Sequence, residues 1–300
     1  MSRRYFPLLL TLSALWGASY LFIKVGVRDL APTVLVELRL LLAAAVLIGF
    51  VWLREGKRAA AELKAAARPG MFLGLLNAAI PFVLIAWGER HIDSGVAAVA
   101  NATVPIFNAL LVLRFNPAER VSGTRFAGVL AGLAGVAVLA GLDPRGGWWA
   151  AAGTLAVVVA SISYAGGGIY GQLRLSRVSG PALAAASIAA AAIYVLPFSL
   201  VQLPHHAPGW KSLASAAALG LLGTGAAQLV LFRMLRLHGA ARTSLVTYLL
   251  PPTALLYGAL FLGEPVTAAE AGGLALILLG VAVGSGLLRP APRAAVEPGR

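Results

Sequence analysis

The sequence has no cysteine and few acidic or histidine residues. Disulfide bonds and thiolate metal sites are therefore excluded. Only 11 of the 300 residues are Asp or Glu and four are His. Neither an H-E-x-x-H nor a G-x-S-x-G pattern occurs, so the sequence offers no metalloprotease or serine-hydrolase site. We therefore expect a protein that is not an enzyme, with no catalytic residue, no cofactor and no metal.

Charged residues of either sign are also scarce. They make up 12% of the chain, hydrophobic residues make up 59%, and the mean hydropathy is +0.85. A water-soluble fold of this length needs more polar surface, so the composition predicts a membrane protein. The net charge of +13 is compatible with nucleic-acid binding, but the basic residues lie between apolar runs and not on a basic tail or domain. We expect a lipid bilayer as partner, and no nucleic acid.

Long apolar runs fill most of the chain. A helix needs roughly 20 apolar residues to cross the hydrocarbon core. Ten runs meet this length, approximately at 5–27, 33–53, 70–88, 95–115, 123–141, 149–171, 181–203, 212–232, 240–262 and 267–288. The fold class predicted is an all-α integral membrane protein with ten transmembrane helices. The first run is read as a retained helix, and the polar segment 54–69 as an amphipathic or solvated loop.

The runs form two similar halves. Pro105, Glu119 and Gly135 recur in order as Pro251, Glu264 and Gly280, about 145 residues later. This predicts a first repeat at 1–145 and a second at 146–288, followed by a cytoplasmic tail at 289–300. Five helices per repeat is an odd number, so the second repeat enters the membrane from the opposite side. Inverted repeats of this kind are typical of carriers.

Lysine and arginine residues predict the orientation. With the N-terminus inside, 18 of them fall on the inner side and 4 on the outer side, and Lys24 and Arg39 lie within spans. Basic residues concentrate in cytoplasmic loops. We expect a multi-pass protein of the bacterial inner (plasma) membrane with both termini in the cytoplasm.

Several short motifs carry a family resemblance. They are the stretch from Trp16 to Lys24, Glu37-x-Arg39, a proline inside the fourth and ninth spans, and Phe-Leu-Gly-Glu264 after the ninth. With these motifs and the predicted topology, the chain resembles the EamA-type transporters of the drug/metabolite transporter superfamily. Asn116 to Glu119 departs from the family pattern, which has Gly-Glu there. The resemblance implies transport of amino acids or related metabolites through a cavity lined by spans one, three, four, six, eight and nine.

Charges at membrane depth are the first candidates for a site, because they are costly unless paired or hydrated. Lys24 and Glu37 lie at similar distances from the first turn, so we expect them to pair. Arg39 faces away from Glu37 and needs another partner, for which Glu89 is a candidate. Lys24 or Arg39 would bind a substrate carboxylate. The alternative is a purely structural pair with an outward-reaching Lys24.

Other polar and aromatic residues complete the candidate site. Trp16, Tyr20 and Lys24 share one face of the first span. Amides facing lipid are costly, so Asn77, Asn101 and Asn108 should face a cavity or another helix. Packing between helices is the alternative for each residue. The substrate-binding candidates are Trp16, Tyr20, Lys24, Arg39, Asn77, Asn101, Asn108, Tyr164, Gln228, Thr247 and Tyr248, and the structural or hinge candidates are Glu37, Pro81, Pro105 and Pro251.

Glycine pairs indicate close helix contacts. Gly128-x-x-x-Gly132 and Gly280-x-x-x-Gly284 permit two helices to approach. We expect the fifth and tenth spans to pack together or to form a homodimer.

The function predicted is a secondary transporter that exports a small polar metabolite by alternating access. A channel-like conduit and a non-transporting scaffold or enzyme are the alternatives.

Overall fold

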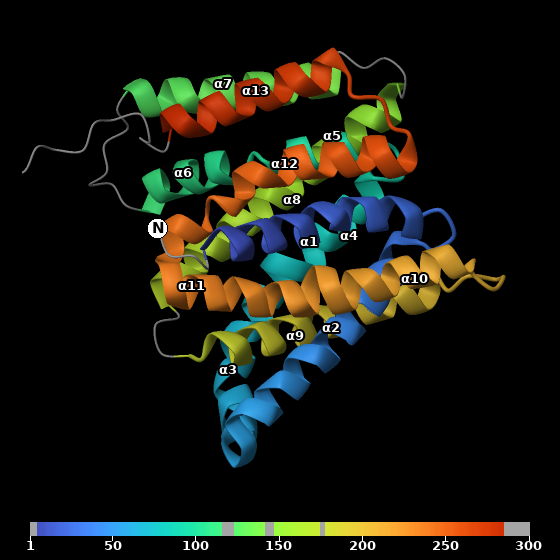
Figure 1. The fold of residues 1–300 in the computed structure, drawn as a ribbon, viewed down its shortest axis with the longest axis vertical. Coiled ribbons are helices and arrows are strands. Elements are labelled where there is room, and N and C mark those ends of the chain that lie inside the picture. The colour runs from blue at the N-terminus through green and yellow to red at the C-terminus, as the bar shows by residue number, and fades with distance from the viewer. Residues whose placement is uncertain (1–4, 116–122, 142–146, 175–177, 285–300) are drawn as a thin grey trace, which may run out of the picture.

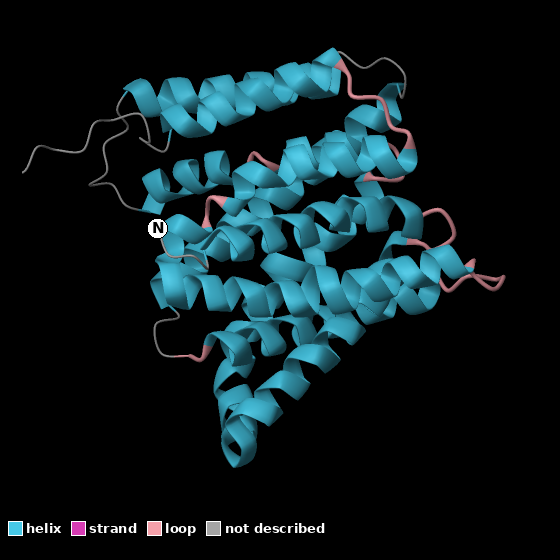
Figure 2. Ribbon diagram, in the orientation of Figure 1, coloured by secondary structure: helices cyan, strands magenta, loops and turns pink. Residues whose placement is uncertain are grey.

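The computed structural model describes residues 5–115, 123–141, 147–174 and 178–284 of the chain. All secondary structure in these ranges is helical, and short loops join the helices at the two ends of a bundle (Figure 2). The tail 289–300 and the segment Asn116–Glu119 lie outside the described residues. The helical membrane fold expected from the apolar runs is confirmed.

The helices of the first half follow the apolar runs. They are α1 (Tyr5–Gly26), α2 (Pro32–Glu55), the short 3-10 turn η1 (Gly56–Arg58), α3 (Ala59–Gly74), η2 (Leu75–Ala79), α4 (Ile80–Gly88), α5 (Ser94–Asn101), α6 (Val104–Phe115) and α7 (Gly123–Gly141). From α3 through η2 to α4 the backbone is one continuous helical run. Its second part coincides with the third predicted span.

The second half has a similar order. It consists of α8 (Gly147–Arg174), α9 (Gly180–Val201), α10 (Trp210–Ala218), η4 (Leu219–Ala226), α11 (Ala227–Thr243), α12 (Val246–Tyr257), η5 (Gly258–Leu262) and α13 (Ala268–Gly284). Among the described residues, five helical segments are long and apolar enough to cross a membrane, and two shorter apolar helices follow them. The number of ten spans stays a prediction.

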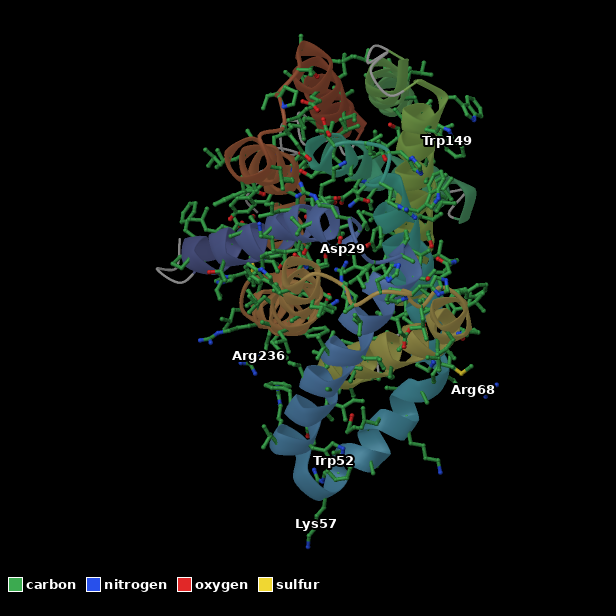
Figure 3. All side chains as sticks on the ribbon, turned by 90° about the vertical axis from the view of Figure 1, so that its right-hand side faces the viewer. Asp29, Trp52, Lys57, Arg68, Trp149 and Arg236 are labelled. Carbon is green, nitrogen blue, oxygen red and sulfur yellow. The ribbon has the colours of Figure 1, made fainter. Side chains whose placement is uncertain are left out.

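The segment 54–69 differs from the loop that we expected. Its first residues end α2 and form η1, and from Ala59 onward it is the first part of α3, because alanine has the highest helix propensity. The hairpin of α2 and α3 extends beyond the other helices, with Lys57 at its tip (Figures 1 and 3). α9 packs against both arms of this hairpin.

Wide helical turns occur at equivalent places in the two halves. η2 and η4 are π-helical, and both begin around the matching sequences Gly74-Leu75-Leu76 and Gly220-Leu221-Leu222. A π-helical turn inserts an extra residue and redirects the side chains after it, and such turns are frequent at functional sites. The duplicated sequence therefore adopts a duplicated backbone feature.

α7 and α13 lie side by side as a separate pair at one edge of the molecule (Figure 1). A Cβ atom on Gly280 would lie 2.5 Å from the carbonyl oxygen of Gly128 and 2.6 Å from the nitrogen of Gly132. The expected packing of the fifth and tenth spans is present. Their glycine faces contact each other within one chain, and the homodimer expected through them is not shown.

The bundle has two ends. The start of α1 lies at one end, the N-terminal end, and the loop between α1 and α2 lies at the other, the Asp29 end. At the Asp29 end, the Asp29 carboxylate accepts hydrogen bonds from the Ser212 hydroxyl at 2.8 Å and the Gly209 amide at 3.1 Å. The carboxylate of Glu264 accepts hydrogen bonds from the Ser94 amide at 3.1 Å. Side-chain contacts thus hold segments of both halves together at this end.

Candidate functional site

A cavity of about 260 Å³ lies between the two halves, in the interior of the bundle. Its walls come from α1, α2, the η2–α4 segment, α5, α6, α8, η4, α11 and α12. The lining residues are Trp16, Ser19, Tyr20, Ile23, Arg39, Asn77, Phe82, Ile85, Ala98, Asn101, Ala102, Val104, Pro105, Tyr164, Gly223, Thr224, Gln228, Thr247, Leu250 and Pro251. Apolar and aromatic walls with a few polar groups are typical of small-molecule sites.

Arg39 is the one charged side chain among these lining residues. It is 6% exposed, and its Nε donates a hydrogen bond to the Thr224 hydroxyl at 2.8 Å. The guanidinium carbon lies 3.7 Å from the ring centre of Phe82, a cation–π contact. The terminal guanidinium nitrogens donate no hydrogen bond to a described residue. They leave a planar pair of donors of the kind that binds carboxylates in bidentate fashion.

A chain of hydrogen bonds links three helices at the cavity wall. The Asn101 Nδ2 on α5 donates to the Tyr20 hydroxyl on α1 at 2.8 Å. Ser161 on α8 donates to the Asn101 Oδ1 at 3.2 Å. Tyr20 and Ser161 are buried, so these bonds satisfy groups that water does not reach. These hydrogen bonds hold the Tyr20 hydroxyl in the cavity wall.

The remaining lining candidates come from both halves. Trp16 on α1 and Tyr164 on α8 contribute aromatic rings, and Gln228 on α11 contributes an amide. The Asn77 Oδ1 is buried without a hydrogen-bond partner among the described residues. The Thr247 hydroxyl donates to the Ser244 carbonyl at 2.7 Å. Eight of the predicted substrate-binding residues therefore line one cavity: Trp16, Tyr20, Arg39, Asn77, Asn101, Tyr164, Gln228 and Thr247.

Lys24 does not line the cavity. Its Nζ donates hydrogen bonds to the backbone carbonyls of Glu89 at 3.0 Å and Ile92 at 2.7 Å, and it lies 3.9 Å from an Asp93 carboxylate oxygen. Carbonyls at the end of a helix have no partner within the helix and carry its negative dipole, which favours a cation there. The expected pair of Lys24 with Glu37 is wrong, because the lysine binds the end of α4 instead.

Glu37 is 5% exposed, and both of its carboxyl oxygens lack a hydrogen-bond partner among the described residues. Arg39, two residues further along α2, contacts Thr224 and Phe82. That Glu37 and Arg39 point apart stays a prediction. The direct pair of Arg39 with Glu89 is absent from the ion pairs of the described residues.

Two further candidates lie away from the cavity. Asn108 on α6 points toward α8, where a Cβ atom on Gly168 would lie 3.4 Å from its Oδ1. Tyr248 packs against the apolar cluster of Val99, Ile106, Ile277 and Val281. The helical spacing of Asn101, Pro105 and Asn108 is not continued in the structure, because a turn at Ala102 and Thr103 separates α5 from α6.

The predicted hinge prolines lie at the start of a helix or inside one. Pro105 follows the turn between α5 and α6, Pro81 begins α4 after η2, and Pro251 lies inside α12. Proline has no N–H, so the carbonyl four residues earlier loses its helical partner. For Pro105 this is the Asn101 carbonyl, which accepts a hydrogen bond from Ser161 at 3.5 Å. Pro105 and Pro251 both line the cavity, one from each half.

Sequence reasoning did not assign Phe82 or Ser19 to the site. Thr224 holds Arg39, and Phe82 lies under its guanidinium group. Thr224 could be recognised from the sequence, because it is a polar residue on the eighth predicted span, in the copy of the segment that contains Asn77. Phe82 could not be recognised, since one aromatic residue in an apolar run has no distinguishing pattern.

A bundle of apolar helices around an internal cavity with aromatic, amide and guanidinium groups defines a multi-pass helical membrane protein with a polar internal cavity. A comparison with protein families identifies the kind of membrane protein. The EamA-like transporter family matches residues 4–141 and 151–285, so nearly the whole chain is covered. The chain belongs to the EamA-like transporter family, and it is a membrane transporter and not an enzyme.

Relatives with similar sequences extend over the same length. The chain is 28% identical over 282 residues to the "uncharacterized inner membrane transporter YedA" of Escherichia coli K12, covering 92% of this chain and 89% of the relative. It is 26% identical to the "probable amino-acid metabolite efflux pump" of the same strain, covering 94% of each. A crystal structure with 23% identity matches with a TM-score of 0.65 over 95% of this chain, which supports the fold alone.

Proposed function

We propose that this transporter exports small polar metabolites, amino acids foremost, across the bacterial inner membrane by alternating access. The observation that carries the proposal is the buried guanidinium group of Arg39 in the wall of a cavity between the two halves. A relative that covers nearly the whole chain is named a probable amino-acid metabolite efflux pump, which agrees with this substrate class.

Substrate recognition in this proposal starts from the carboxylate. The free terminal nitrogens of Arg39 bind it, because a charge-assisted bidentate contact is both strong and directional. The amides of Asn77, Asn101 and Gln228 offer donors and acceptors to other polar groups of the solute. The rings of Trp16 and Tyr164 contact its apolar part. The volume of about 260 Å³ suits a solute the size of one amino acid.

Movement in this proposal uses the two halves as inverted repeats of five spans each. The N- and C-termini lie in the cytoplasm, so the Asp29 end faces outward. The solute stays near the middle of the membrane while the halves rock around it. Pro105 and Pro251 serve as the flexible points, because each leaves the helix backbone without one of its hydrogen bonds beside the cavity.

The substrate contact is tested with Arg39→Gln. Proteoliposomes with the purified protein are loaded with unlabelled L-phenylalanine, and the uptake of labelled L-phenylalanine is measured. We expect saturable counterflow for the wild type and an apparent affinity about ten- to a hundredfold weaker for the variant, since a hydrogen-bonded charge contact is lost.

Arg68→Gln is the matched control, because Arg68 is exposed on α3 and points away from the bundle (Figure 3). It should transport like the wild type. Counterflow that does not saturate would indicate a channel-like conduit, and wild-type affinity in Arg39→Gln would remove Arg39 from the binding site.

A further inference from the structure

A second hollow, called here the basic groove, lies at the N-terminal end of the bundle. It has a volume of about 840 Å³, and its walls come from α1, α2, α3, the start of α9, and α11. Within this group, α9 packs against α2, α3 and α11 (Figure 1). Apolar side chains line the groove together with three arginines, Arg54, Arg233 and Arg236. None of the described residues lines both this groove and the central cavity.

Two walls of the basic groove show the same order of side chains. On α11, Leu229, Arg233 and Arg236 are spaced by four and three residues, so they share one face. α11 follows η4, which contributes to the central cavity, so the arginines lie nearer to the N-terminal end than Leu229 does. On α2, Phe50 precedes Arg54 by one turn, and Arg54 lies in the last turn of the helix. The groove is therefore apolar toward the middle of the bundle and basic at its end.

The two arginines of α11 are not paired with a carboxylate of the described residues. Both are exposed, and neither Arg233 nor Arg236 forms an ion pair there. Of the two acidic lining residues, Glu55 compensates Arg54, with 3.3 Å between its carboxylate oxygen and the Arg54 Nε. Glu62 on α3 forms no ion pair with a described residue. The two guanidinium groups of α11, one turn apart, can therefore donate several hydrogen bonds to one anion.

An anionic phospholipid matches this order of side chains. Guanidinium groups bind phosphate oxygens in bidentate fashion, and the apolar wall is complementary to acyl chains. A free phosphate ion would use the arginines but would leave the apolar wall without a partner. In the proposed topology the N-terminal end faces the cytoplasm, and basic pockets between transmembrane helices on that side bind anionic headgroups. Charge and hydropathy thus favour a lipid of the inner leaflet over a soluble anion.

We propose that the basic groove binds an anionic phospholipid, with its phosphate at Arg233 and Arg236 and its acyl chains along Phe50 and Leu229. This inference goes beyond the proposed function and does not depend on which solute is transported. The lipid contacts α2 of the first half and α11 of the second half. Because it binds the folded protein, it raises the stability of the protein by mass action.

The test uses the full chain, purified in dodecyl maltoside, washed free of lipid and titrated with dioleoylphosphatidylglycerol while thermal unfolding is followed. The melting temperature should rise and then saturate. Dioleoylphosphatidylcholine, which has no net charge, should bind about tenfold more weakly or worse, because its charge is compensated. Sodium phosphate, compared with sodium chloride of equal ionic strength, should leave the melting temperature unchanged. Equal affinity for the two lipids, or equal stabilisation by phosphate, overturns the proposal.

The double variant Arg233→Gln with Arg236→Gln removes both unpaired guanidinium groups. Its apparent affinity for phosphatidylglycerol should fall by about tenfold or more, since charge-assisted hydrogen bonds are lost. Arg58→Gln with Arg68→Gln is the matched control, because it removes the same charge from exposed positions of η1 and α3 that do not line the groove. It should bind like the wild type. Unchanged binding in the first variant, or an equal loss in both, overturns the proposal.

A second measurement needs no variant and so does not depend on how the substitutions fold. A phosphatidylglycerol with a diazirine in its acyl chain is photolysed with the wild-type protein, and peptide mass spectrometry locates the product. We expect crosslinks on α2 around Phe50 and on α11 around Leu229. Excess unlabelled phosphatidylglycerol should remove them, and the same excess of phosphatidylcholine should not. Crosslinks absent from both segments, or removed equally well by both lipids, contradict the proposed site.

Discussion

At the scale of single residues, the role of a polar side chain depends more on the residue that it contacts than on the helix that carries it. Lys24 and Tyr20 lie one turn apart on α1. Tyr20 faces the cavity and accepts a hydrogen bond from Asn101, whereas Lys24 reaches past the cavity to the carbonyls of Glu89 and Ile92. One stripe on one helix therefore contributes both to the cavity wall and to the contact with the end of α4.

Tyr20→Phe tests the hydrogen-bond chain at the cavity wall. The substitution removes the acceptor of the Asn101 amide and leaves a partly buried donor unpaired, so we expect a loss of about 1 kcal/mol in the free energy of unfolding. The melting temperature in detergent should fall, and the apparent affinity for L-phenylalanine should weaken.

Tyr170→Phe is the same substitution on α8, at a ring that contacts Phe72 at a tilt of 43° with centres 4.3 Å apart and makes no hydrogen bond among the described residues. It should melt like the wild type. Equal losses in both variants would mean that the Tyr20 hydroxyl contributes nothing specific.

At the scale of elements, glycine determines how closely helices approach. The faces of α7 and α13 meet at backbone distance around Gly128, Gly132 and Gly280, and a Cβ atom on Gly135 would lie 2.8 Å from the Gly273 carbonyl oxygen. In lipid, such close packing replaces the hydrophobic effect as the force between helices. The pair connects the two halves, because one helix comes from each.

Gly280→Ala should destabilise this pair. The added methyl group would meet the backbone of α7, which cannot move aside as a side chain can, so we expect a loss of about 1–3 kcal/mol. The control is Gly272→Ala on the same helix, where a Cβ atom has no neighbour within 4 Å. Thermal unfolding in detergent measures both. A melting temperature that Gly280→Ala leaves unchanged would show that the α7–α13 contact does not limit stability.

At the scale of the whole molecule, the orientation in the membrane is open to a direct measurement. The chain has no cysteine, so single cysteines can be introduced without removing others. Lys57 lies at the exposed tip of the α2–α3 hairpin, and His206 lies in the exposed loop between α9 and α10. In the proposed topology an odd number of spans separates them, so they lie on opposite sides of the membrane.

We expect a membrane-impermeant maleimide added to intact cells to label Lys57→Cys only after permeabilisation and His206→Cys before it. The positive charges near Lys57 favour the cytoplasm. The unmodified chain is the control and should not be labelled. Labelling of both variants from the same side would contradict the inverted arrangement of the two halves.

The sequence alone determined the membrane environment, most of the helix positions and eight of the residues that line the cavity. Apolar runs depend on local composition, so the predicted span at 123–141 coincides with α7 and the span at 5–27 with α1. Arg39, Tyr20 and Asn101 were recognisable because polar groups are rare in such runs. All three line the cavity.

Only the tertiary structure decided the partner of each polar group. Lys24 binds the end of α4 and not Glu37, Arg39 binds Thr224, and Asn108 faces α8. The physical reason is that spacing along one helix places a side chain on a face, whereas its partner depends on which helix packs against that face. The glycines of α7 and α13 show the same rule, since their sequences permit either an internal contact or a homodimer and the fold brings the two helices together.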